Sequence, residues 1–546
     1  MIFNKTFIGV LSLFASLSLQ AQQQGERPKL VVGIVVDQMR WDYLYRFEER
    51  YGEGGFKRLL NEGFSNENTY IPYIPTYTAI GHSTVYTGSV PAIHGITGND
   101  FIIQATGQEM YCTQDDSVNG VGTTSKAGKM SPKNLLTSTV TDQLRLATNF
   151  KSKVFGISLK DRGGILPAGH FANAAFWFDG DSGKWISSTF YMDSLPKWLV
   201  DFNNQNLTEK YLTKWETLYP INTYTQSEPN NNPYKNNYKG LSKSEFPYNL
   251  KALIKDNGLG LIRSTPFGNS LTKDLALTLI DKEKLGHNPT GATDFLAVSF
   301  SSTDYIGHQF ATNSIEIEDT YLRLDKDLED MFKYLDKNVG KGEYLVFLTA
   351  DHGGAHNPKY FQDKKGNAGY FQTSDVKKAL NETLNKKFGS NNLVRSLENY
   401  QVHLNYQEIE KLDLDQDDII EIAIKFLKKQ DGVSFVANLD DIDKYAIPAT
   451  IKERMINGYN FKRSGVISYI LDPQWYGGKL NGGGTTHGTW SPYDSHIPFV
   501  LMGWNIKHGK NINPVSMTDI APTISALLKI EEPNGNIGKP VTEVFK

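Results

Sequence analysis

Carboxylate and imidazole side chains follow several of the most apolar runs of this sequence. The runs VVGIVV, DFLAVSF and YLVFLT are each followed closely by an aspartate, and two of those aspartates have a histidine nearby. A mixed oxygen and nitrogen ligand set of this kind suits zinc. Six side chains make up the set: Asp37, Asp304, His308, Asp351, His352 and His487.

Six ligands are enough for two ions with three protein ligands each, which leaves coordination positions for water or substrate. Two zinc ions about 4 Å apart form a clamp for in-line displacement at phosphorus. The alternative is that each residue has an ordinary structural role, with Asp37 capping a helix and His487 lying in a surface loop. The joint pattern favours a two-metal hydrolytic centre over that alternative.

A hydroxyl nucleophile is available in the segment IPTYTAIGHSTVYTG, where Thr78 lies in a turn punctuated by proline and glycine. A threonine hydroxyl is a poor nucleophile alone, and coordination to a metal is one way to activate it. We therefore predict Thr78 as the nucleophile, without a His–Asp relay.

The elements that must position these groups are five apolar runs that we interpret as buried strands. Continuous apolar runs are typical of a mainly parallel sheet covered on both faces, and helical patterns such as residues 314–337 lie between them. This alternation predicts an α/β fold with helices on both sides of the sheet. Proteins with such sheets bind small molecules beyond the carboxyl ends of the strands. The side chains that we predict as metal ligands lie at the same ends. The five runs are residues 29–36, 153–158, 294–300, 344–349 and 497–503.

Two regions interrupt the pattern and are predicted to be insertions. Residues 171–270 are rich in Asn, Tyr, Thr and Pro, which indicates irregular surface structure. Residues 359–480 contain strand, amphipathic helix and strand patterns that suggest a small α+β cap. The acidic run DLDQDD, from Asp413, lacks the Gly and the Glu that a calcium loop requires at its sixth and twelfth positions. We interpret it as the start of a helix.

Composition sets further bounds. The 546 residues carry a net charge of -3, so neither nucleic acid nor an anionic membrane surface is a predicted partner. Residues 1–21 have the pattern of a secretory signal peptide, which predicts export to the periplasm, no membrane insertion after cleavage and a mature domain over residues 22–546. The single cysteine, Cys112, excludes an internal disulfide. The oligomeric state stays open, and a monomer is compatible with the sequence.

The order of these residues resembles that of the alkaline phosphatase superfamily, over nearly the whole chain. The segments VVDQMRWDYL, PTYTAIGHSTVYTG, HGITGND, SLKDR, STDYIGH, ADHG and GTTHGTW look like those of the phosphate-irrepressible periplasmic alkaline phosphatases, which use Thr where better-known members use Ser. The resemblance implies two Zn²⁺ ions per chain, with Thr78 as the attacking group. It assigns one ion to Asp304, His308 and His487, and the other to Asp37, Asp351 and His352.

The substrate class depends on the segment SLKDRGG. Lys160 and Arg162 lie two residues apart, so they point the same way if the segment is extended. Two cations there would favour a phosphomonoester dianion over a diester monoanion, and the resemblance adds Asn99 as a phosphoryl contact. The predicted activity is phosphate monoester hydrolysis through a phospho-threonine intermediate. We expect a broad substrate specificity, as in an enzyme that scavenges phosphate.

The nearest alternative is a nucleotide pyrophosphatase/phosphodiesterase with the same two-zinc site. A sulfatase would need a Cys or Ser in a C/S-x-P-x-R context, and Cys112 in YCTQDD does not fit. A cofactor-independent phosphoglycerate mutase would be cytosolic, which disagrees with the predicted signal peptide. A non-catalytic metal-binding module is the most different alternative.

Overall fold

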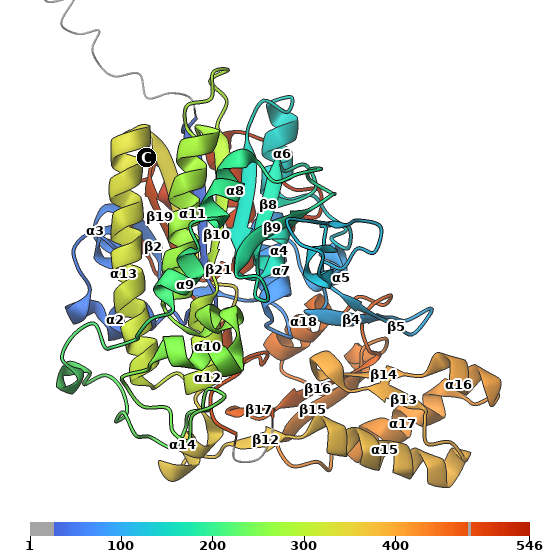
Figure 1. Ribbon diagram of the computed structural model, residues 1–546. Coiled ribbons are helices and arrows are strands. Elements are labelled where there is room, and N and C mark those ends of the chain that lie inside the picture. The colour runs from blue at the N-terminus through green and yellow to red at the C-terminus, as the bar shows by residue number, and fades with distance from the viewer. Residues whose placement is uncertain (1–26, 479–481, 546) are drawn as a thin grey trace, which may run out of the picture.

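A ten-stranded sheet forms the centre of the molecule (Figure 1). The computed structural model describes residues 27–478 and 482–545, so the predicted signal peptide lies outside the described residues. In spatial order the strands are β20 (Gly509–Asn511), β2 (Phe64–Asn66), β19 (Phe499–Gly503), β11 (Tyr344–Thr349), β1 (Leu30–Val36), β10 (Asp294–Phe300), β7 (Val154–Ser158), β8 (Ala174–Asp179), β9 (Lys184–Ser188) and β6 (Gly120–Val121).

The middle of this sheet is parallel, as the continuous apolar runs predict. Strand β1 pairs in parallel with β10 and β11, and β10 pairs in parallel with β7. Every residue of β1 and β10 is buried, because helices cover both faces. Val36 lies opposite Phe300, and Val35 lies opposite Thr349, so the carboxyl ends of three strands meet at one edge. The fifth predicted strand is also present, as β19, but it runs antiparallel to β11.

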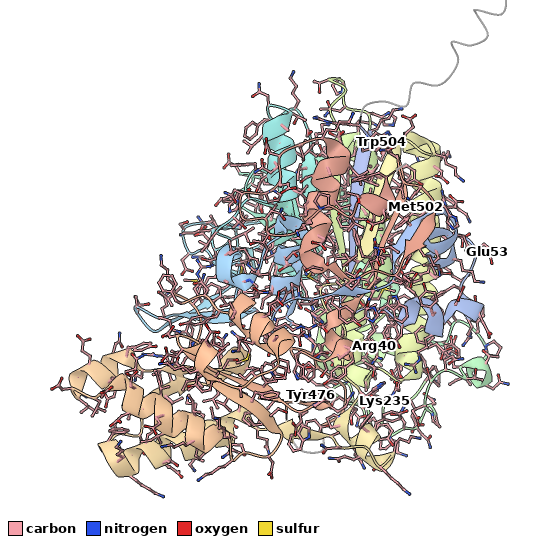
Figure 2. The ribbon with its side chains drawn as sticks, turned by 180° about the vertical axis from the view of Figure 1, so that it is seen from behind. Arg40, Glu53, Lys235, Tyr476, Met502 and Trp504 are labelled. Carbon is pink, nitrogen blue, oxygen red and sulfur yellow. The ribbon has the colours of Figure 1, made fainter. Side chains whose placement is uncertain are left out.

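Helices pack on both faces of the sheet. In Figure 1, α11 (Phe267–Glu283) and α13 (Ile315–Leu335) lie in front of it, and the view from behind in Figure 2 shows α20 (Ile520–Leu528), in red, on the other face. Helix α13 confirms the predicted helix at residues 314–337. The Ser314 hydroxyl caps its first turn by accepting from the N–H of Ile317, and Glu316 and Glu318 are favoured there by the helix dipole.

The expectation of irregular surface structure over residues 171–270 is wrong for the first part of that segment. Strands β8 and β9 belong to the central sheet, and Trp177 and Trp185 are fully buried. The Asn- and Pro-rich stretch that follows dominates the composition of the whole segment, so composition alone hides two short strands. Between β9 and α11 the chain forms the short helices α8 (Lys197–Asn203), α9 (Leu207–Tyr211) and α10 (Leu250–Asn257).

Residues 369–477 build a second layered unit, here called the cap, which projects from the strand-end side of the sheet in Figure 1. It has its own apolar cluster around Leu380, Ile419 and Leu427. The strand, helix and strand predicted at 400–405, 417–430 and 433–439 are confirmed as β14, α17 and β15, and α17 begins after an Asp415 cap. The cap consists of helices α15 (Thr373–Phe388) and α17 (Gln416–Leu427) on a sheet of β13 (Val394–Ser396), β14 (Gln401–Leu404), β16 (Ile467–Leu471) and β15 (Val433–Asn438).

Over residues 27–478 and 482–545, no helix combines the length and the apolar composition that crossing a bilayer requires.

Candidate active site

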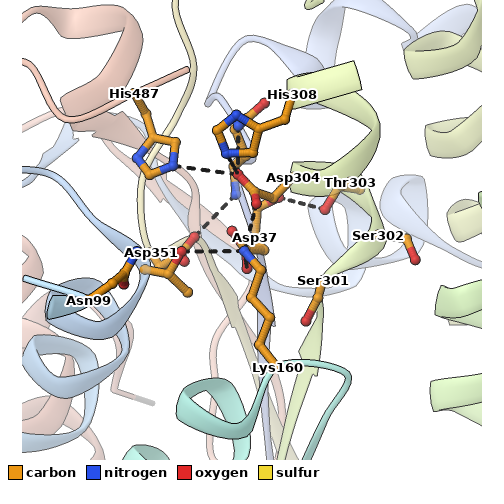
Figure 3. A network of polar contacts seen from close by, with 12 residues as sticks. Asp37, Asn99, Lys160, Ser301, Ser302, Thr303, Asp304, His308, Asp351 and His487 are labelled. Atoms are coloured by element: carbon orange, nitrogen blue, oxygen red, sulfur yellow. Dashed lines mark hydrogen bonds and ion pairs between the residues drawn. The ribbon is translucent and has the colours of Figure 1, made fainter. Parts of the chain in front are cut away.

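The predicted ligands converge at the edge where the central strands end (Figure 3). Asp37 follows β1 directly, and Asp351 comes two residues after β11. Helix α12 (Ser302–Phe310) follows β10 and carries Asp304 and His308 four residues apart, on one helix face. His487 reaches the same space from the loop before α19 (Pro492–Ser495).

Two groups of three side chains are compact enough to hold a metal ion. Asp37, Asp351 and His352 form one group, which is the set that the resemblance assigned to a single zinc. Asp304 and His487 form the other together with His352, so that His352 belongs to both. The ligand atoms of each group lie within 4.8 Å of one another, and all of these residues are buried.

His308, the predicted third ligand beside Asp304 and His487, lies at the rim of the site. Its Nε2 is 3.1 Å from Asp304 Oδ1, while its Nδ1 is 2.8 Å from the carbonyl oxygen of Thr485. This second contact turns Nε2 toward the centre, as a ligand requires. The side chain is 39% exposed, whereas that of His352 is fully buried.

The charge of the site fits divalent cations. Asp37, Asp304 and Asp351 are buried together, and the ammonium of Lys160 lies 2.7 Å from Asp37 Oδ2 and 2.6 Å from Asp304 Oδ2. One ammonium cannot neutralise three carboxylates. Among the described residues, both oxygens of Asp37 and Oδ2 of Asp351 are buried and are not satisfied by hydrogen bonds. Buried carboxylate oxygens of this kind are paired or coordinate metals.

The carboxylates differ in how readily they ionise. Burial, with the repulsion of Asp351 and Asp304, holds the pKa of Asp37 well above its usual range, although Lys160 lowers it. Burial also opposes ionisation of Asp304, but His308 and Lys160 outweigh it and lower the pKa of that carboxyl. Burial lowers the pKa of the His352 and His487 rings, which favours the neutral imidazole that binds metals.

Thr78 is the first residue of helix α4 (Thr78–Thr87), whose ten residues are all buried. Its Oγ1 lies 3.3 Å from Nε2 of His352 and 3.4 Å from Nζ of Lys160. The hydroxyl therefore faces the cluster of predicted metal ligands, at the positive end of the helix dipole. Asn99 Oδ1 accepts from the N–H of Ala79, so the amide NH₂ of Asn99 remains available to donate toward the adjoining cavity.

Lys160 and Arg162 do not lie on an extended segment, so that part of the argument from sequence is wrong. Lys160 immediately precedes helix α7 (Asp161–Ala168), and Arg162 lies in its first turn. Helix α7 lies in the crossover between β7 and β8, because two strands that pair in parallel require such a connection. Lys160 points into the carboxylate cluster (Figure 3), whereas Arg162 donates from Nη1 to the Tyr111 hydroxyl at 3.0 Å.

Two residues of the site carry no motif signal of their own. The backbone N–H of Gln38 donates to Asp351 Oδ1 at 3.1 Å, and its Nε2 donates to Asp304 Oδ1 at 2.6 Å. His82 Nδ1 lies 2.9 Å from the carbonyl oxygen of Thr78 and 3.3 Å from Asp351 Oδ2. Each residue links parts of the site that are distant in sequence. The available signal was position, since Gln38 follows Asp37 and His82 lies one helical turn after Thr78.

Substitution of Gln38 tests whether the residues that contact the predicted ligands support metal binding. Groups that orient metal ligands typically contribute 10–100-fold to metal affinity or activity, so Gln38→Ala is expected to lower both by at least about tenfold. Gln474→Ala is a matched control, because Gln474 is also a buried glutamine with positive φ and lies in the region of the cap. Metal content after dialysis and kcat/KM for an aryl phosphate are the measurements. Unchanged values in Gln38→Ala would remove Gln38 from the site.

Four further histidines have structural contacts. His356 Nδ1 contacts Asn313 Nδ2 at 3.1 Å, and burial beside Arg40 lowers its pKa to about 3. His170 contacts Asp142, and His496 stacks on Trp41. His94 is buried, with Nδ1 accepting from the N–H of Ile96.

Comparison with known proteins places the chain in a family. The sequence model of the Type I phosphodiesterase / nucleotide pyrophosphatase family matches residues 31–492. The chain is 62% identical over 545 residues to a Myroides odoratus protein named calcium-transporting ATPase, covering 100% of both chains. It is 51% identical over 544 residues to the alkaline phosphatase PafA of Elizabethkingia meningoseptica, covering 99% of both.

A crystal structure of wild-type PafA superimposes with a TM-score of 0.93 at 52% identity, over 95% of this chain and 99% of that one. This agreement confirms the α/β fold expected from the resemblance. The chain therefore belongs to the Type I phosphodiesterase / nucleotide pyrophosphatase family of the alkaline phosphatase superfamily and is an enzyme of the alkaline phosphatase type.

Proposed function

We propose that the enzyme hydrolyses phosphate monoesters with two zinc ions and a phospho-Thr78 intermediate. The observation that carries this proposal is the position of Lys160, whose ammonium lies 3.4 Å from Thr78 Oγ1 and is 3% exposed. A monoester dianion carries one negative charge more than a diester on its nonbridging oxygens. A buried cation beside the nucleophile stabilises that additional charge.

Each residue of the site has a separate role in the proposed reaction. Asp37, Asp351 and His352 would hold one zinc, and Asp304, His308 and His487 the other, with His352 close enough to contribute to both. When bound, zinc supplies a Lewis acid that polarises the phosphoryl group and lowers the pKa of a coordinated hydroxyl. Thr78 attacks phosphorus, and the ester oxygen leaves. The N–H donors of Lys160, Arg162 and Asn99 orient the phosphoryl oxygens, and water then releases phosphate from Thr78.

Comparing 4-nitrophenyl phosphate with methyl 4-nitrophenyl phosphate tests the substrate class. The wild type is expected to have the higher kcat/KM for the monoester. Lys160→Ala is expected to lower kcat/KM for the monoester on the order of 10²-fold, the usual loss for one charge-stabilising donor, and to lower that for the diester less. A preference for the diester in the wild type that persists in Lys160→Ala and Arg162→Ala would support the phosphodiesterase alternative instead.

Lys235→Ala is the matched control for this comparison. Lys235 is also buried and pairs with a buried carboxylate, Glu316, at 2.8 Å. Its loss should destabilise the fold to a similar extent, because it leaves an unpaired buried charge. The ratio of monoester to diester hydrolysis should stay at the wild-type value, so that a change of ratio in Lys160→Ala reports on the phosphoryl group.

The name of the Myroides relative raises ATP as a substrate. The terminal phosphoryl group of ATP presents the same doubly charged end as a monoester, so release of phosphate from ATP falls within the proposed chemistry. We further propose export to the periplasm, on the pattern of residues 1–21, and one catalytic domain over residues 22–546. Within that domain, the separate apolar cluster of the cap supports an insertion at about 359–480, and the Asn- and Pro-rich stretch supports one within 171–270.

A further inference from the structure

A cavity of about 440 Å³ adjoins the reacting groups. Asn99 and His487 form part of its wall, so it reaches the space in front of Thr78. The opposite wall comes from the cap, through Glu398, Tyr400 and Tyr469. The alcohol part of an ester whose phosphorus lies at Thr78 can extend into this cavity. Its lining therefore contacts the leaving group of the proposed reaction.

The lining of the cavity is acidic. Asp100 and Glu109 contribute to it from the hairpin of β4 (Asp100–Ile103) and β5 (Gln108–Tyr111), and Glu398 contributes from the cap. Within the described residues, none of the three forms an ion pair within 4.0 Å of a lysine or arginine, although Arg162 and Lys377 act on Asp100 and Glu398 at longer range. Burial and the mutual repulsion with Glu109 and Asp100 raise the pKa of Glu398. A positive charge placed among them would relieve that repulsion.

The cavity also has an aromatic wall. The Tyr400 ring lies 5.9 Å from that of Tyr469 and 6.5 Å from that of Tyr77. Tyr400 is 6% exposed. Its hydroxyl accepts from the N–H of Gly477 at 3.5 Å. Aromatic faces combined with carboxylates are a typical surface for ammonium groups, quaternary ones above all.

The backbone holds this wall in an unusual conformation. Asn399 and Tyr400 both have positive φ, 58° and 56°, which costs energy for residues other than glycine. Asn399 Nδ2 donates to the carbonyl oxygen of Asp100 at 2.8 Å, across the junction between cap and core. The contact that fixes the strained turn thus also joins the acidic and aromatic parts of the wall.

We propose that this cavity is a leaving-group subsite selective for phosphate monoesters whose alcohol carries an ammonium group. The proposal rests on the proposed monoesterase function and specifies its substrate class. Leaving groups that carry a carboxylate or further phosphates are disfavoured by the same three acidic residues, so ATP is expected to be a poorer substrate than a cationic monoester.

Phosphocholine and 3,3-dimethylbutyl phosphate provide the test, because their alcohols have the same shape and differ by one positive charge. The quantity measured is the ratio of kcat/KM for the charged ester to that for the neutral one. Replacing Asp100→Asn, Glu109→Gln and Glu398→Gln together is expected to lower this ratio about tenfold, the lower end of what charged clefts contribute. Comparing enzymes by their ratios cancels the different intrinsic reactivities of the two esters.

The control enzyme carries the same three kinds of substitution at exposed carboxylates elsewhere, Glu53→Gln, Asp201→Asn and Glu421→Gln. Its ratio should equal that of the wild type. An equal ratio in the wild type, the control and the acidic-site variant would overturn the proposal. If the triple variant does not fold, Glu398→Gln alone decides, and a ratio unchanged by it and by raising the salt concentration in the wild type overturns the proposal equally.

Failure of the proposed function gives a different result. In that case the wild type would not turn over 4-nitrophenyl phosphate, and neither ester of the pair would be hydrolysed. Hydrolysis of 4-nitrophenyl phosphate combined with unchanged ratios would leave the monoesterase function standing and remove only the selective subsite.

Discussion

Thr78→Ala is expected to lower kcat for phosphate monoesters by on the order of 10⁴-fold or more, as loss of a covalent nucleophile does in other hydrolases. The hydroxyl lies at the start of a fully buried helix, within 3.4 Å of both His352 and Lys160, so water has no equivalent position from which to attack. Rapid quenching of the wild type with substrate should trap phosphate on the peptide that contains Thr78. The variant should show no such peptide.

Two controls sharpen this prediction. Thr78→Ser keeps a hydroxyl at the same place and should retain most of the activity and the trapped phosphopeptide. Thr84→Ala removes a hydroxyl that is equally buried in the same helix but contacts His94 instead of the site. It should leave kcat near the wild-type value. A Thr78→Ala enzyme with wild-type kcat would show that the nucleophile is another group.

The second large effect is expected from loss of the metal, and His352→Ala is the substitution that tests it most directly. His352 belongs to both compact ligand groups, so its loss should lower the zinc content by more than one equivalent per chain. Activity should fall with it, on the order of 10⁴-fold, because a two-metal centre supplies both nucleophile activation and leaving-group stabilisation. The zinc content is measured by elemental analysis of the dialysed protein, and the activity is measured as kcat on the same preparation.

The matching control is His94→Ala, since His94 is also fully buried but contacts Thr84 and the backbone of Ile96. It should keep its zinc. Chelation of the wild type should abolish activity while circular dichroism shows a folded chain, because the large apolar core does not include the ligands. Unfolding on chelation without any hydrolysis to lose would favour the non-catalytic metal-binding alternative.

The sheet was predictable because its strands are buried on both faces, which leaves a continuous apolar signal in β1, β10 and β11. The same physics placed the polar residues that follow each strand at one edge. Strands β8 and β9 were missed because they lie next to a long polar segment. Their burial depends on tryptophan contacts made across the fold.

For the site, residue types and spacing were enough to select the ligands but not their mutual arrangement. Two features depend on the three-dimensional fold. His352 lies close to both groups of aspartates, and Lys160 precedes a helix instead of lying on an extended segment. Gln38 was hidden for a different reason. Its backbone N–H donates to Asp351, 313 residues away, and its side-chain amide donates to Asp304, 266 residues away. No local sequence pattern therefore indicates the role of Gln38.

The cap is one continuous segment of the chain, inserted between strands β11 and β19, and this arrangement affects how fast the sheet can form. Strands β11 and β19 are neighbours in the sheet, and Thr349 donates to the carbonyl oxygen of Pro498 across a separation of 149 residues. Closing so long a loop in an unfolded chain is entropically costly and slow. A cap that folds first brings both ends of the loop to one side of a compact body. The effective loop then shortens, and β19 can pair with β11 soon after the parallel core has formed.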